Sequence, residues 1–138
     1  MVTLDTNVVV RLLVGDDPAQ TPIAERAFLE HTRGDGVFVP IVVLVETSWV
    51  LARGYQLSRA IVHERLDRLA RTQGVTLESP GVVLEALVDH ANGTADFADY
   101  VLRASASSAG ALPVLTFDRK LAREEDVELL RAAGRHRG

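Results

Sequence analysis

Short runs of β-branched residues alternate along this chain with longer amphipathic segments, and this alternation constrains the fold more than any other feature. Each apolar run spans three to five residues and is followed by a stretch with helical spacing of its apolar residues. Such an order predicts parallel strands covered by helices on both faces. No internal repeat or low-complexity stretch divides the 138 residues. We therefore expect one α/β domain over residues 1–138.

Glycine, proline and capping residues predict where the elements begin and end. Strands are expected at Val2–Asp5, Val37–Val39, Val75–Leu77 and Leu112–Thr116. Helices are expected at Thr6–Val14, Pro22–His31, Ile41–Arg53, Ser58–Arg71 (with Ser58 as the N-cap), Pro80–His90, Asp96–Ala109 and Asp118–Arg123. Val127–Leu130 fits either a fifth strand or a helical turn, and the tail Arg131–Gly138 is expected to be frayed.

Composition excludes several classes of protein and site. The absence of cysteine excludes a disulfide scaffold, a thiolate zinc site and a cysteine nucleophile, and it suits the reducing cytoplasm. The longest apolar run, Ile41–Val45, is too short to span a membrane, and the N-terminus lacks the features of a signal peptide. The 15 basic residues are outnumbered by 19 acidic ones, for a net charge of −4. Any nucleic acid must therefore be held by local basic groups, against the net negative charge of the chain.

Two aspartates follow predicted strands. Asp5 closes the first strand, and Asp118 lies two residues beyond Thr116 at the end of the fourth. Ligands of open parallel sheets bind beyond the carboxyl ends of the strands, so we expect both carboxylates at the same edge of the sheet. The structural alternative is that each aspartate only caps the helix that follows it.

Glu46 interrupts an apolar run within a predicted helix. Helical spacing places it on a stripe with Val42 and Val50, where a carboxylate is costly unless it is paired, protonated or bound to a metal. Buried acids occur more often at working sites than elsewhere. The structural alternative is a buried ion pair with Arg53 or Arg11.

Asp96 and Asp99 are three residues apart at the start of a predicted helix, so both carboxylates lie on one face near the positive end of the helix dipole. Capping and dipole compensation explain Asp96 well. They explain Asp99 less well, because Asp99 lies among the apolar residues Phe97, Tyr100 and Leu102.

These acids share one predicted geometry. Several carboxylates gathered in one cleft repel each other, and a hard divalent cation removes that penalty. An all-oxygen set of ligands without cysteine or histidine selects Mg²⁺ or Mn²⁺. Such a cation activates water and neutralises charge on a phosphodiester. No histidine lies within these motifs, which favours activation of water by the metal over a histidine base.

Four motifs resemble those of the PIN-domain ribonucleases, and most closely those of the VapC toxins of bacterial toxin–antitoxin pairs. Leu4–Asn7 is similar to the family's opening motif and Pro40–Leu51 to its second. Asp96–Asp99 is similar to the third motif and Thr116–Leu121 to the closing one. The motifs occur in the family's order, with similar separations, over nearly the whole chain.

The resemblance implies a three-layer α/β/α fold around a central, mainly parallel sheet of four to five short strands. It implies an endoribonuclease that acts as a toxin in the cytoplasm with Mg²⁺ or Mn²⁺, forms a homodimer and binds a VapB-type antitoxin. The implied catalytic acids are Asp5, Glu46, Asp96, Asp99 and Asp118.

Roles for these acids follow from the resemblance and from metal chemistry. Asp5 and Asp99 are the expected main metal ligands, Glu46 and Asp118 are expected to bind the metal directly or through water, and Asp96 is expected to orient a ligand water. Three further residues are expected to hydrogen-bond Asp5, a phosphate or the attacking water, with turn and capping roles as the alternative: Thr6, Asn7 and Thr116.

Basic and apolar residues predict the partners. Arg119 and Lys120 are the favoured RNA contacts because of their place beside Asp118, and the full set of candidates is Arg11, Arg53, Arg59, Arg65, Arg68, Arg71, Arg119 and Lys120. For Arg65, Arg68 and Arg71 a solvated helix face is the favoured interpretation. A homodimer is expected because one small sheet does not need all the apolar surface of Val8, Val9, Leu12, Leu13 and Ile41–Leu51.

Two other functions fit some of the same acids. Haloacid-dehalogenase-like phosphatases have a nucleophilic aspartate after the first strand and a second aspartate two residues later, but here that second position is Asn7. Release of phosphate from a small phosphomonoester, without RNA cleavage, would favour that reading. The other alternative is a non-catalytic interaction module whose acids bind a structural cation.

Overall fold

The computed structural model describes residues 1–131 and has six α-helices, two short irregular helices and five short strands within them. The tail that was expected to be frayed, Arg131–Gly138, lies outside the described residues from position 132 onward. The strands are β1 (Val2–Thr3), β2 (Val37–Val39), β3 (Val75–Leu77), β4 (Val114–Thr116) and β5 (Val127–Leu129). The helices are α1 (Thr6–Val14), α2 (Gln20–Arg33), α3 (Ile41–Trp49), α4 (Arg59–Ala70), α5 (Pro80–Asn92) and α6 (Phe97–Ser108), with a π-helix η1 (Val50–Gly54) and a 3₁₀-helix η2 (Leu121–Arg123).

The helix ends follow from local chemistry. The Asp5 carboxylate caps α1 by accepting a hydrogen bond from the backbone N–H of Val8 at 3.1 Å. Gly15 ends the same helix in the left-handed region at φ 72°, a conformation that favours glycine. Ser58 caps α4 as predicted, because its hydroxyl accepts from the N–H of Ile61. The predicted order of strands and helices is confirmed, with helix ends shifted by one or two residues at most positions.

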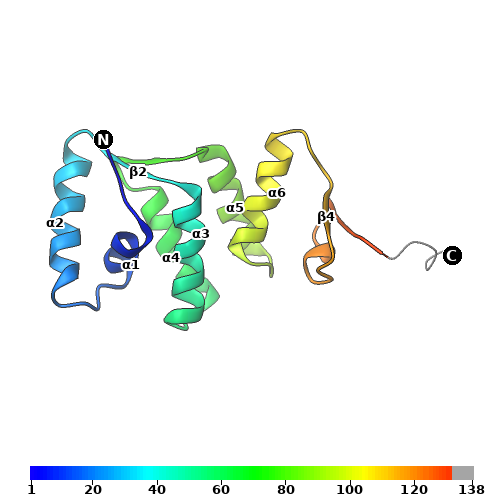
Figure 1. Cartoon of the computed structure of the whole chain (residues 1–138), viewed down its shortest axis with the longest axis horizontal. Coiled ribbons are helices and arrows are strands. Elements are labelled where there is room, and N and C mark those ends of the chain that lie inside the picture. Colours follow the sequence, from blue (N-terminus) through cyan, green and yellow to red (C-terminus); the bar gives the residue numbers. More distant parts are fainter. Residues whose placement is uncertain (132–138) are drawn as a thin grey trace.

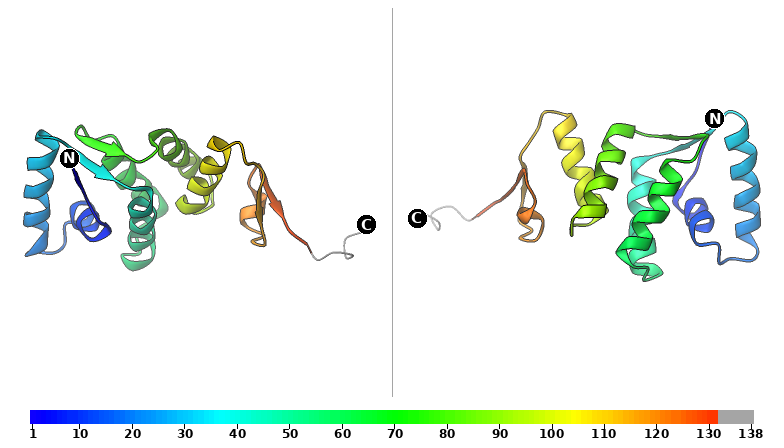
Figure 2. Two further views of the ribbon diagram at one scale, coloured as in Figure 1. Left: turned by 45° about the horizontal axis from the view of Figure 1, so that its top comes forward. Right: turned by 180° about the vertical axis from the view of Figure 1, so that it is seen from behind.

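The α/β class and the parallel pairing of the strands are confirmed, but the strands form two sheets rather than one central sheet. The first sheet has the order β1-β2-β3, with Val2 opposite Val37 and Val37 opposite Val75. The second pairs β4 with β5. Along the molecule, α2 lies at one end and β4 at the other, with α5 and α6 between them (Figure 1), and both views of Figure 2 keep this order. Asp5 and Asp118 therefore follow strands of different sheets, which corrects the expectation of a shared edge.

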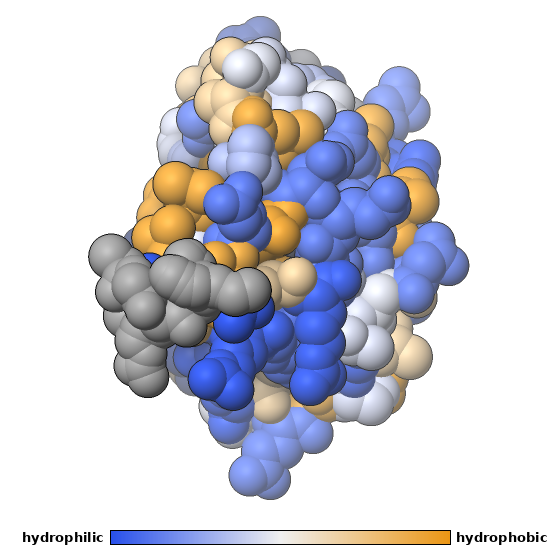
Figure 3. Space-filling view, turned by 90° about the vertical axis from the view of Figure 1, so that its right-hand side faces the viewer, coloured by the Kyte–Doolittle hydropathy of each residue, from blue (hydrophilic) through white to orange (hydrophobic). Residues whose placement is uncertain are grey.

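After α6 the chain leads away from the first sheet (Figure 1). Helix α6 packs against α5 and α3, and the connection that follows Ser108 carries β4 away from β1. We call residues 112–131, which hold β4, η2 and β5, the C-terminal unit. Its exposed apolar side chains are Leu112, Leu115, Phe117 and Leu130. Seen from this end, the molecule shows hydrophobic surface gathered to one side of a largely hydrophilic face (Figure 3).

The core is built by the elements that precede the C-terminal unit. Buried side chains from Leu4 to Val101 form one cluster, with Val9 and Val37 completely buried. Residues of α1 that were expected to be surplus apolar surface, Val8 and Leu12 among them, pack against this cluster instead. Within the described residues, no helix has the length and apolarity needed to cross a lipid bilayer.

The junction between α5 and α6 is tightly packed, and it places the acids at the start of α6. The Tyr100 hydroxyl accepts a hydrogen bond from the N–H of Ala95 at 3.2 Å, in a buried position. A Cβ at Gly93 would lie 1.8 Å from that hydroxyl oxygen, so only glycine fits there. This contact fixes the turn that leads into Asp96.

Candidate functional site

Asp5, Thr6 and Glu46 meet where the start of α1 lies against α3. The Thr6 hydroxyl donates a hydrogen bond of 2.7 Å to Oε1 of Glu46, which joins the first and second motifs directly. Asp5 uses one carboxylate oxygen to cap α1. The predicted role of Thr6 as a positioning group is thus matched by a contact with Glu46 rather than with Asp5.

Glu46 is exposed, which corrects the expectation of a buried carboxylate. Its neighbours on the same face of α3, Val42 and Trp49, are 60% and 40% exposed, so this stripe faces outward and the core lies under the other side of the helix. Neither expected ion-pair partner is engaged with Glu46. Arg11 contacts Asp17 and Gln20, and Arg53 contacts Asp96.

Asp96 and Asp99 lie on the first turn of α6 as predicted. Asp96 occupies the N-cap position, but its side chain makes no capping hydrogen bond. Its carboxylate lies 3.6 Å from the Arg53 guanidinium instead. The Asp99 pKa is raised above its ordinary value, first by burial and then by the negative charge of Asp96, while Lys120 opposes the shift.

Asp118 also contributes to the raised pKa of Asp99, so the third and closing motifs lie near each other. The Asp118 carboxylate accepts hydrogen bonds from the N–H groups of Lys120 at 2.8 Å and Leu121 at 3.2 Å. Its own N–H donates to the Thr116 hydroxyl at 2.9 Å. Asp118 therefore does cap the turn that follows it, and it uses one oxygen, Oδ1, for both of these bonds.

The donor set fits a hard cation, but its members form two groups. Thr6, next to Asp5 in the sequence, bonds Glu46, whereas the negative charges of Asp96 and Asp118 both act on Asp99. Within residues 1–131, no three histidine, aspartate or glutamate side chains lie close enough together to hold one metal ion. The chemistry of these carboxylates suits Mg²⁺ or Mn²⁺, and contact between α3 and α6 brings the elements that carry the two groups together.

The other predicted site residues line two open grooves. Asp5, Asn7 and Arg11 border a groove of about 380 Å³ between α1 and α2. Arg119 borders a groove of about 810 Å³ on the C-terminal unit, together with Arg123 and Arg131. Lys120 lies near Asp99. Arg11 and Arg119 thus lie in separate grooves.

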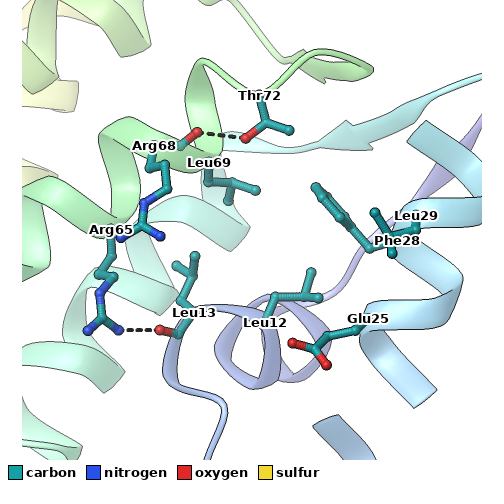
Figure 4. Close-up of a pocket in the computed structure, with 9 residues that line it drawn as sticks. All are labelled: Leu12, Leu13, Glu25, Phe28, Leu29, Arg65, Arg68, Leu69 and Thr72. Carbon is teal, nitrogen blue, oxygen red and sulfur yellow. Dashed lines mark hydrogen bonds between the residues drawn. The ribbon is translucent and has the colours of Figure 1, made fainter. Parts of the chain in front are cut away.

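A third groove, of about 630 Å³, lies between α1, α2 and α4, away from the acids. Its floor is apolar and includes Leu12, Phe28 and Leu69 (Figure 4). Arg65 stands at its edge and donates a hydrogen bond to the backbone carbonyl of Leu13. Across from it, Glu25 projects from α2.

Several residues that lie beside Asp96 are not part of the predicted site. Ser48, Trp49 and His90 line a small cavity with Asp96 and Arg53. His90 comes from the end of α5 and is far from Trp49 in the sequence. No local spacing therefore signals that the two side chains lie close together. The only indication in the sequence is that Trp49, the one tryptophan, follows Glu46 by three residues.

This chain is similar to known proteins over most of its length. The family model of the PIN domain matches residues 2–126. A VapC ribonuclease from Aquifex aeolicus is 26% identical over 121 residues, which cover 87% of this chain and 89% of that protein. The crystal structure of Mycobacterium tuberculosis VapC20, described as a sarcin–ricin loop-cleaving toxin, matches with 23% identity and a TM-score of 0.43, over 94% of this chain and 98% of that one.

Proposed function

This chain belongs to the PIN-domain family, and from that premise we propose that it is a metal-dependent endoribonuclease and the toxin of a toxin–antitoxin pair. The observation that carries the proposal is the environment of Asp99. Its pKa is raised by burial and by Asp96 and Asp118, so carboxylates from two motifs repel each other at one place on the surface. A divalent cation would relieve this repulsion. The similarity to a VapC ribonuclease supports RNA as the substrate.

Each acid has a proposed part in holding the cation, which requires the two groups of acids to come closer together than they lie in the structure of residues 1–131. Asp5 and Asp99 are the main ligands, Glu46 and Asp118 bind directly or through water, and Asp96 orients a ligand water. When bound, the cation would activate water and offset charge on the scissile phosphate.

Neighbouring groups in the structure position these acids. Thr6 holds Glu46 at 2.7 Å, and the N–H groups at positions 120 and 121 hold one oxygen of Asp118. The Thr116 hydroxyl accepts a hydrogen bond from the backbone N–H of Asp118. Asn7 borders the groove beside Asp5, where its amide is suited to contact a phosphate.

The charges on the chain suit local contact with RNA. Arg119 and Lys120 follow Asp118 and are both exposed, so they are free to contact phosphates beside the acids. Arg11 is held by Gln20 and Asp17 and contributes a fixed positive charge to the groove near Asp5. His90 lies near Asp96, but burial and neighbouring positive charge lower its pKa to about 4, which makes it a poor general base at neutral pH.

Incubation of the purified chain with total cellular RNA tests the proposed activity. We expect cleavage with Mg²⁺ or Mn²⁺ and its loss in EDTA, with recovery when the cation is restored. Cleavage that continues undiminished in EDTA would refute the metal dependence. Phosphate release from p-nitrophenyl phosphate without RNA cleavage would favour the phosphatase alternative.

The groove between α1, α2 and α4 supports a protein partner. Its apolar floor and the charges of Arg65 and Glu25 at opposite edges suit an apolar segment with charged flanks, as in helix-in-groove recognition. We propose that an antitoxin of the VapB type, acting in the cytoplasm, inserts such a segment here. With such a segment bound in the groove, the acids stay accessible unless another part of the antitoxin covers them.

We also propose a homodimer. Val42 on α3, Val88 on α5 and Leu102 on α6 are 60%, 55% and 47% exposed, and together they provide apolar surface that a second copy would cover. Sedimentation at micromolar concentration reads the oligomeric state, and a strictly monomeric profile would count against this proposal.

A further inference from the structure

A small cavity of about 130 Å³ lies beside Asp96, between η1, α4, α5 and the start of α6. Much of its wall is apolar and comes from Ala52, Leu57, Val62 and Phe97. Polar side chains also line it, and an apolar wall with several polar groups is typical of ligand pockets. The cavity is separate from the three grooves and from the groups that hold Glu46 and Asp118.

Two of the residues that line the cavity have buried nitrogen atoms without a hydrogen-bond partner in the described part of the chain. His90 is only 4% exposed, and its Nδ1 has no hydrogen-bond partner among the described residues. The same holds for Nε of Arg59, although another nitrogen of that guanidinium donates to the carbonyl of His90 at 2.9 Å. Leaving such groups unpaired costs free energy, so the site is suited to a molecule that supplies hydrogen-bonding atoms.

Trp49 and Arg53 form the rim. The Trp49 side chain is 40% exposed, and the Arg53 guanidinium lies 5.6 Å from the centre of its ring. Arg53 also lies 3.6 Å from Asp96. An aromatic face and a guanidinium plane are the two surfaces on which unstacked nucleobases most often rest in RNA-binding proteins.

We propose that this cavity receives one nucleobase of a single-stranded RNA, with Trp49 as the stacking surface and Arg59 and His90 as the groups that meet the edge of the base. The inference rests on the proposed function, which makes RNA the substrate. The apolar wall argues against a phosphate, because a dianion would be poorly solvated there. The lowered pKa of His90 leaves its ring neutral at pH 7, which suits an uncharged ligand.

The position of the cavity gives this base contact a consequence for cleavage. Asp96 lines the cavity and lies beside Asp99, so a base held there places a neighbouring phosphate near the acids. Trp49, Arg59 and His90 would then determine which phosphate in a strand is presented for cleavage. In this role they are specificity-determining residues, and none of them reacts.

Filling the cavity from its rim is the sharpest test, because Ala52 lines it and is exposed. The probe is an eight-nucleotide single-stranded RNA in EDTA, and the signal is the fluorescence of Trp49, the one tryptophan in the chain. We expect quenching in the wild type and binding weakened about tenfold in Ala52→Leu. The matched control is Ala60→Leu, an exposed alanine of α4 outside the cavity, which should bind as the wild type does.

A second pair of variants separates stacking from a general loss of structure. With end-labelled RNA and fluorescence anisotropy, Trp49→Ala should weaken binding about tenfold, whereas Trp49→Phe should retain most of it because a phenyl ring still stacks. The melting temperatures of all four variants are measured alongside. Equal binding by Ala52→Leu and Ala60→Leu, or by Trp49→Ala and Trp49→Phe, would overturn the inference, as would quenching by inorganic phosphate alone.

Cleavage of the same RNA with Mg²⁺ separates this inference from the proposed function. Cleavage by Ala52→Leu at the same positions and with the same KM as the wild type overturns the base-binding cavity and leaves the nuclease proposal standing. A wild type that does not cut RNA, but whose Trp49 quenching is lost in Ala52→Leu, supports the cavity and overturns the nuclease proposal.

Discussion

Arg103 holds the C-terminal unit to the rest of the chain, and its replacement by methionine should loosen that unit. The guanidinium lies 3.0 Å from the carboxylate of Asp89 on α5 and 3.6 Å from that of Glu124. It also donates to the backbone carbonyl of Glu125 at 3.2 Å. Its side chain is only 16% exposed, and it lies over the ring of Tyr100. Methionine keeps most of the length and apolar contact of the side chain while it removes every one of these polar contacts.

The expected loss of stability is about 2 kcal/mol. A hydrogen bond to a charged group contributes about 1.5–3 kcal/mol, and a neutral one about half as much. The partners Asp89 and Glu124 remain 29% and 19% exposed, so water replaces part of the lost interaction, and the sum falls well short of the values for fully buried pairs. For a chain of this length, a loss of this size lowers Tm by roughly 6–10 °C.

The assay compares Arg103→Met with Arg123→Met, a control that removes an exposed arginine from the same unit. Thermal unfolding reads the stability, and limited digestion with elastase reads the opening of the connection over residues 109–113, which contains Ala109 and Ala111. We expect faster cleavage of that connection in Arg103→Met and little change in the control. Equal melting and equal digestion of the two variants would refute the role given to Arg103.

Two further predictions concern the acids and the partner groove. Because the pKa of Asp99 is raised, its ionisation destabilises the folded state, and this penalty is absent below the ordinary value of 3.8 and grows as the pH rises through the raised pKa. In EDTA at pH 7, Asp99→Asn should therefore melt no lower than the wild type, with the difference vanishing in acid, while RNA cleavage falls by orders of magnitude; a variant that cuts RNA normally would disprove its role as a ligand. Leu29, which is 48% exposed in the groove of Figure 4, should tolerate aspartate with RNA cleavage unchanged but lose affinity for the antitoxin by pull-down, and full retention of the antitoxin would place it elsewhere.

Local chemistry made most elements predictable from the sequence. Ser58 caps α4 because a serine before an amphipathic segment commonly caps a helix. Gly15 ends α1 because few other residues adopt its backbone conformation. The predicted helix Ile41–Arg53 is found, but its last turn is a π-helix from Val50. The spacing of residues around Val50 does not predict that change of hydrogen bonding, since π-helical turns are rare.

Features that depend on distant contacts were not predictable in the same way. Helical spacing shows that Glu46 shares a face with Val42, but it does not show whether that face is buried in the core or exposed to solvent. In the structure the face is exposed. Similarly, the strand pattern of β4 predicts a parallel neighbour without identifying it, and the neighbour is β5. The link from Thr6 to Glu46 joins residues 40 positions apart, so only the resemblance between motifs indicated that they would meet.

The separation of the C-terminal unit from the core sets how this protein should lose activity. The buried cluster ends at Val101, and Leu121 is the one residue of the C-terminal unit's described part that is buried. Regions with few buried apolar contacts open locally at a lower free energy than the whole domain. Amide hydrogens of β4 and β5 should therefore exchange with solvent through opening events that leave α3 to α5 protected. Because Asp118 is carried by this region, heating should inactivate the site reversibly, while most of the chain is still folded.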